Sequence, residues 1–115
     1  MELAQALSQV NLLDGVPCRI ELSSEVFELE SGIIFDNRTR ASEVSLIGVA
    51  GETFLQTSAS PRLLISVGSG APPISILYMH MDGQIRVTTG GKVTVTDCVI
   101  GATLLRAKAG GDGRR

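Results

Sequence analysis

The chain has 115 residues, which is enough for one domain and too few for two. Hydrophobic residues make up 43% and aromatic residues only 3%, so the composition excludes global disorder and predicts a core of Val, Ile, Leu and Ala. The net charge of −2 excludes a general attraction to nucleic acid.

Charge is unevenly distributed along the chain. Residues 1–60 hold nine acidic and three basic side chains, whereas residues 61–115 hold three acidic and seven basic ones. Much of the basic excess lies near the end, where we expect residues 106–115 to form a flexible, solvated basic tail. The two cysteines, Cys18 and Cys98, are too few for a disulfide framework or a four-ligand zinc site. A stacked fold also disfavours a bridge between them, because it would join the first and last coils.

The beginning of the chain lacks the basic and apolar regions of a signal peptide, and no stretch reaches the roughly 20 apolar residues of a membrane helix. Localisation stays open between a cytosolic protein and a piece of an exported one. We expect three parts: a capping helix in residues 1–16, strand-rich coils in 17–105 and the tail in 106–115.

Residues 2–13 show helical spacing. Leu3, Ala6, Leu7 and Val10 fall on one stripe, and the pair Asp14-Gly15 ends the helix. A helix of about 12 residues is marginal alone, so its apolar stripe must pack on something.

From residue 19 onward the hydrophobic period changes to two, as in strands. Short apolar runs are separated mostly by Gly, Ser, Pro, Asn or Asp, at a spacing of about ten residues. The runs are Ile20/Leu22, Phe27/Leu29, Ile33/Phe35, Val44/Leu46, Phe54/Leu55, Leu63/Ile65/Val67, Ile74/Ile76, Ile85/Val87 and Val93/Val95.

Such strands fit either an antiparallel sandwich or a solenoid of stacked coils. Asp82-Gly83 is the only candidate for a two-residue hairpin, aromatic residues are few, and a first coil needs a lid such as the opening helix. These features favour the solenoid. It requires Leu46, Ile76 and Val95 to lie one above another, on strands that run in the same direction.

Four segments carry a resemblance to a known family: residues 20–29 (IELSSEVFEL), 44–51 (VSLIGVAG), 64–71 (LISVGSGA) and 90–100 (GGKVTVTDCVI). In this order, after an opening helix, they resemble the first coils of right-handed parallel β-helix proteins of the pectate-lyase-like superfamily. The resemblance implies an all-β fold: a short right-handed parallel β-helix (solenoid) with an N-terminal capping α-helix. The family pattern continues for more coils than this chain has, which predicts an open last coil or a fragment of a longer β-helix.

The resemblance also implies where a polysaccharide-processing site would lie. Such enzymes combine calcium-binding carboxylates with an arginine base on the outer face, and the matching residues here are Asp82, Arg86 and Asp97. Calcium requires several converging carboxylates, which this half of the chain hardly offers. We therefore expect these three residues to be ordinary solvated side chains. We expect no metal site and no cofactor.

Two further candidates come from the residues themselves. His80 is the only histidine, with Met79 and Met81 on the opposite face and Asp82 as the near acid that a general base would need. A lone outward-facing histidine is the simpler interpretation. The sequence Asn37-Arg38-Thr39 is an N-glycosylation motif in a bend, relevant only to a chain that enters a eukaryotic secretory route.

Small polar residues opposite the apolar layer predict a flat, repetitive outer face; they are Ser66, Ser75, Thr88, Thr94 and Thr96. Such a face suits either a soluble sheet surface or the binding of an extended glycan.

Three functions therefore remain open. The first is a non-enzymatic structural or interaction module, which presents its surface to a protein partner or is one segment of a larger surface protein. The second is a glycan-binding or degenerate polysaccharide-lyase-like domain, and the third is a small β-sandwich binding module. Unpaired strand edges at the last coil also predict self-association.

Overall fold

The computed structural model describes residues 3–10, 12, 14–58, 61–88 and 90–100. The predicted basic tail, 106–115, and the last five residues of the predicted coils, 101–105, lie outside the described residues. The chain opens with one helix, α1 (Leu3–Val10), and continues as eleven short strands.

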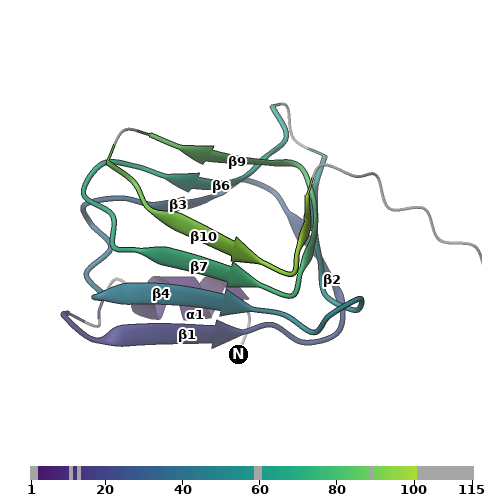
Figure 1. Cartoon of the computed structure of the whole chain (residues 1–115), viewed down its shortest axis with the longest axis horizontal. Coiled ribbons are helices and arrows are strands. Elements are labelled where there is room, and N and C mark those ends of the chain that lie inside the picture. Colours follow the sequence, from purple (N-terminus) through teal and green to yellow (C-terminus); the bar gives the residue numbers. More distant parts are fainter. Residues whose placement is uncertain (1–2, 11, 13, 59–60, 89, 101–115) are drawn as a thin grey trace, which may run out of the picture.

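The strands form three sheets, and each sheet takes every third strand of the chain. The first sheet contains β1 (Pro17–Glu21), β4 (Glu43–Ile47), β7 (Ile74–Leu77) and β10 (Val93–Thr96). The second contains β2 (Val26–Leu29), β5 (Phe54–Thr57), β8 (His80–Asp82) and β11 (Val99–Ile100). The third contains β3 (Ile33–Phe35), β6 (Leu63–Val67) and β9 (Gln84–Val87). Figure 1 shows the strands of the first sheet side by side, with those of the third sheet running in the opposite direction across the molecule.

Every strand pair among the described residues is parallel. This pairing confirms a mostly β protein with parallel sheets and excludes the antiparallel sandwich. Asp82-Gly83 is accordingly not a hairpin: it joins β8 of the second sheet to β9 of the third. Glycine is required there, because a Cβ on Gly83 would lie 2.6 Å from Cγ of Leu64.

Inward-facing residues of successive strands lie in register. Leu46 pairs with Ile20 and Ile76, and Ile76 pairs with Val95, as the solenoid argument requires. The exposed fractions are 8% for Ile20, 1% for Leu46, 0% for Ile76 and 40% for Val95. Burying a side chain of this size stabilises the fold by about 1.5–3 kcal/mol, so the middle of the column contributes most and its last member least.

The helix packs on this core at the β1 end of the molecule (Figure 1). Val10 is buried, while Leu3, Ala6 and Leu7 are half-buried against the core, which confirms the predicted apolar stripe. Within the predicted span, 2–13, Leu12 lies in a turn rather than in the helix, while residues 2, 11 and 13 lie outside the described residues. The described part of the chain contains no helix long and apolar enough to cross a bilayer.

Buried threonines at the two ends of β5 connect it to the segment that contains β2. Thr53 is fully buried; its hydroxyl donates a 2.8 Å hydrogen bond to the carbonyl of Ser23 and accepts one of 2.8 Å from the backbone N–H of Val49. The hydroxyl of Thr57 donates to the carbonyl of Leu29 at 2.8 Å. Both threonines thus satisfy backbone groups at the corners, where strand pairing ends.

Candidate functional site

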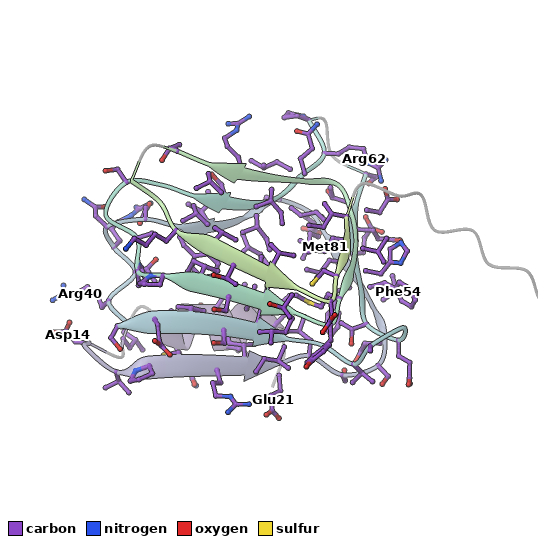
Figure 2. All side chains as sticks on the ribbon, viewed as in Figure 1. Asp14, Glu21, Arg40, Phe54, Arg62 and Met81 are labelled. Carbon is purple, nitrogen blue, oxygen red and sulfur yellow. The ribbon has the colours of Figure 1, made fainter. Side chains whose placement is uncertain are left out.

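The outer face of the second sheet carries the predicted residues His80 and Asp82. Both lie on β8 and are half-buried, whereas Met79 and Met81 are buried on the opposite side, as the alternation predicts (Figure 2 labels Met81). The His80 ring packs against Phe54, the residue paired with it on β5, with ring centroids 5.3 Å apart and planes tilted by 48°. His80 is therefore not a simple solvent-facing side chain, and its Nε2 atom is buried without a hydrogen-bond partner among the described residues.

The carboxylate of Asp82 is engaged by an arginine rather than by His80. A guanidinium nitrogen of Arg62 lies 2.7 Å from a carboxylate oxygen of Asp82 and 3.2 Å from the backbone carbonyl of the same residue. Another nitrogen of Arg62 donates to the carbonyl of Thr57 at 3.2 Å. The Asp82 side chain is only 16% exposed. Since no hydrogen bond joins Asp82 to His80 in the described part, the acid that would orient a histidine base is occupied elsewhere. Sequence reasoning did not find Arg62, because it reaches Asp82 only through the pairing of β6 with β9.

Arg86 and Asp97 lie on other parts of the surface. Arg86 is exposed on β9 of the third sheet, in register with Ser66 and pointing away from the core as expected. Asp97 is exposed at the corner between β10 and β11, with φ +52°. Across the residues that the structure describes, no hydrogen bond or ion pair joins any two of the four predicted site residues. No group of three or more His, Cys, Asp or Glu side chains in the described ranges is arranged to hold a metal ion.

The glycosylation motif lies in an ordered turn after β3. Asn37 is exposed, but Thr39 is buried and its hydroxyl accepts a 3.1 Å hydrogen bond from the N–H of Asp36. Arg38 donates to Asp36 through its guanidinium, at 3.0 Å, and through its backbone N–H, at 2.9 Å. These bonds, the side-chain one first, lower the pKa of the Asp36 carboxyl. The motif is thus built around an Asp36–Arg38 turn.

The predicted outer face of small polar residues is divided between two sheets. Ser75, Thr94 and Thr96 lie on the outer face of the first sheet, where Ser75 is in register with Thr94. Ser45 extends this row on β4. Ser66 and Thr88 belong to the third sheet and the turn after it. The five residues therefore do not form the one outer face that the sequence had predicted. The reason is that consecutive strands belong to three different sheets, which period-two alternation alone does not reveal.

The end formed by β9, β10 and β11 is open. Inward-facing residues there remain exposed: Val87 by 45%, Val95 by 40% and Ile100 by 43%. No described strand pairs with the outer edges of β9, β10 and β11. This end therefore combines unpaired backbone groups with an uncovered apolar layer.

The opposite end contains a groove that sequence reasoning missed. It lies between α1 and the first three strands and has a volume of about 1200 Å³. The helical stripe and the acidic first half of the chain were the two signals for it. Neither signal, however, gives the length or the placement of the helix, which decide whether it covers the end fully.

Both cysteines are free, with Cys18 buried on β1 and Cys98 half-buried beside the corner at Asp97.

Comparisons of the chain with protein-family models, with curated proteins and with solved structures gave no significant match.

Proposed function

We propose that the chain is a short right-handed parallel β-helix that works as a non-enzymatic interaction module and associates through its open end. Support for the coil interpretation comes from the recurrence of three strands, one for each sheet, and from the in-register columns of buried residues. The resemblance of four segments to the first coils of pectate-lyase-like proteins stays a prediction.

The observation that carries the functional proposal is the exposed apolar layer at β9, β10 and β11. In the middle of the stack the same layer is closed: Val67, directly beneath Val87, is fully buried. Exposure of Val87, Val95 and Ile100 is costly in water, and the adjacent strand edges are ready to accept further strands. A second copy of the chain satisfies both needs.

The test is sedimentation of the full chain over a range of concentrations. We expect the wild type to associate as its concentration rises, and Val95→Lys to shift it towards the monomer because it places a charge in the apolar layer. The matched control is Val49→Lys, since Val49 is 39% exposed but lies between β4 and β5, outside both the open end and the groove at the helix end. It should associate as the wild type does.

Ile100→Lys provides a second variant, at the last described residue, in case the first one unfolds. A wild type that is monomeric at every concentration contradicts the proposal. So does an equal loss of association in the Val49→Lys control.

A second candidate function, glycan binding, is favoured by the row of Ser45, Ser75 and Thr94 on the outer face of the first sheet. A glycan array, with and without calcium, tests it. Binding that is lost on Ser75→Lys and retained on Arg86→Ala places the glycan on this sheet, whereas loss on Arg86→Ala and Asp97→Ala supports the lyase-like alternative. Absence of binding removes both.

A further inference from the structure

The groove at the helix end has an apolar floor. Its lining comes from α1 and from the segment that contains β1, β2 and β3, with no residue from later strands. Leu3 and Leu7 of the helix and Phe27 and Leu29 of β2 line it and are only half-buried. The helix thus leaves part of the apolar layer at β2 accessible.

The rim of the groove is acidic. Glu21, Glu25, Glu28 and Glu30 line it and are all exposed. Arg19 is the one basic residue in the described lining, and it lies 3.9 Å from Glu21 (Figure 2 labels Glu21 at the β1 end). An occupant that fits this surface must be apolar with basic flanks.

The chain contains a segment of that chemistry directly after its last described strand. Residues 103–108 read TLLRAK, with two adjacent leucines followed by Arg106 and Lys108. Residues 101–115 together hold four basic side chains and one acidic side chain. We propose that residues 103–108 of one copy bind in the acid-rimmed groove of the next copy, so that the copies join head to tail. This inference rests on the proposed self-association and specifies its partner surface.

The open end gives the reason for choosing a second copy. A copy whose open end stacks on the helix end of the next one covers Val87, Val95 and Ile100, and it brings the segment that begins three residues after Ile100 to the groove. To enter its own groove, the same segment must cross three strand steps of the second sheet, from β11 to β2, which is roughly 14 Å, and it leaves the open end uncovered.

Head-to-tail contacts do not close on themselves unless the rotation between copies forms a ring. The proposal therefore predicts a series of oligomers that lengthens with concentration rather than a discrete dimer.

Charge reversal on the two surfaces tests the inference in the full chain. We expect Glu28→Lys/Glu30→Lys to weaken association by roughly tenfold or more, because it turns attraction across the interface into repulsion. The same should hold for Arg106→Glu/Lys108→Glu alone. Mixing the two variants should restore association between them, since each carries the surface that the other needs.

The matched control is Glu43→Lys/Glu52→Lys, which changes the net charge equally at two exposed residues outside the groove. Equal weakening by this control, or a mixture that fails to associate, overturns the inference. If Val95→Lys still abolishes association in that case, the open-end proposal survives and only the groove is excluded.

A peptide of residues 101–112 gives an independent readout. In excess it should compete with association of the wild type, whereas a scrambled peptide of the same composition should not. A monomeric chain whose residues 103–108 are protected from exchange at every dilution indicates occupancy within one copy, and contradicts the inference.

Discussion

The two ends of the stack differ in how their apolar layers are covered. At the helix end Val10 is buried, and an ion pair of 3.3 Å between Asp14 and Arg40 connects the segment after the helix to the turn before β4. At the other end Val87 and Val95 keep 45% and 40% of their surface exposed, although they belong to columns that are closed further down. The comparison teaches that position in the stack, more than residue type, determines how much a valine contributes here.

The largest expected effect is on the free energy of unfolding, and it differs between two residues that pair with each other, Val67 and Val87. Val67→Ala should lower the free energy of unfolding by about 2–3 kcal/mol, because it removes buried methyl groups and leaves a cavity. Val87→Ala should cost less than about 1 kcal/mol, since nearly half of the side chain is already in water. Urea unfolding at low protein concentration measures both.

Equal costs at Val67 and Val87 would contradict the description of an open end. A cost at Val87 that grows with protein concentration would instead sharpen it, by showing that association covers the layer.

The helix end offers the next largest effect. Val10→Ala should cost about 1–2 kcal/mol of unfolding free energy, because Val10 is the helix residue that is buried against the first coil. Leu12→Ala is the control, since Leu12 is 78% exposed and its loss should be nearly neutral. The difference between the two, measured by urea unfolding, reports how firmly the helix covers this end. Equal effects would mean that the helix does not act as a lid.

Most of the strand pattern follows from the sequence, because nine strands coincide with the short apolar runs that Gly, Ser, Asp or Pro mostly separate. The other two, β8 and β11, were not predicted as separate strands. Each follows a corner made by one non-glycine residue with positive φ, Tyr78 at +57° and Asp97 at +52°, so no glycine marks the turn. Contacts between distant segments were not predicted either: Arg62 and Asp82 are 20 residues apart and meet because β6, which follows Arg62, pairs with β9, which follows Asp82.

Substitutions at these two corners should change the stability by a smaller amount. Tyr78 lies before β8, in the middle of the second sheet, and Asp97 lies between β10 and β11, near the open end. The left-handed conformation is strained for Tyr78 and better tolerated by Asp97. Tyr78→Asn should therefore stabilise the protein by about 0.5–1 kcal/mol, whereas Asp97→Asn should change little. Thermal unfolding of both variants is the measurement. A Tyr78→Asn protein that melts below the wild type would show that the contacts of the tyrosine outweigh the strain of its backbone.

The smallest expected effect is a loss of stability at acidic pH, and it comes from Asp36 in the turn between β3 and β4. Hydrogen bonds from Arg38 hold the pKa of Asp36 below its ordinary value of 3.8. The unfolded chain therefore takes up this proton first as the pH falls, so the contribution to stability is present above about pH 4 and is lost as the pH drops through the lowered pKa. Asp36→Asn should flatten that part of the stability curve, measured by urea unfolding in steps below pH 5. Arg38→Met should flatten it equally, because it removes the donor that causes the shift. If only the first variant changed the slope, the partner of Asp36 would have to be another group. Since neither Asp36 nor Arg38 lines the groove or belongs to the open end, the slope should be the same at every protein concentration. This result separates proton uptake by the fold from any effect of pH on association.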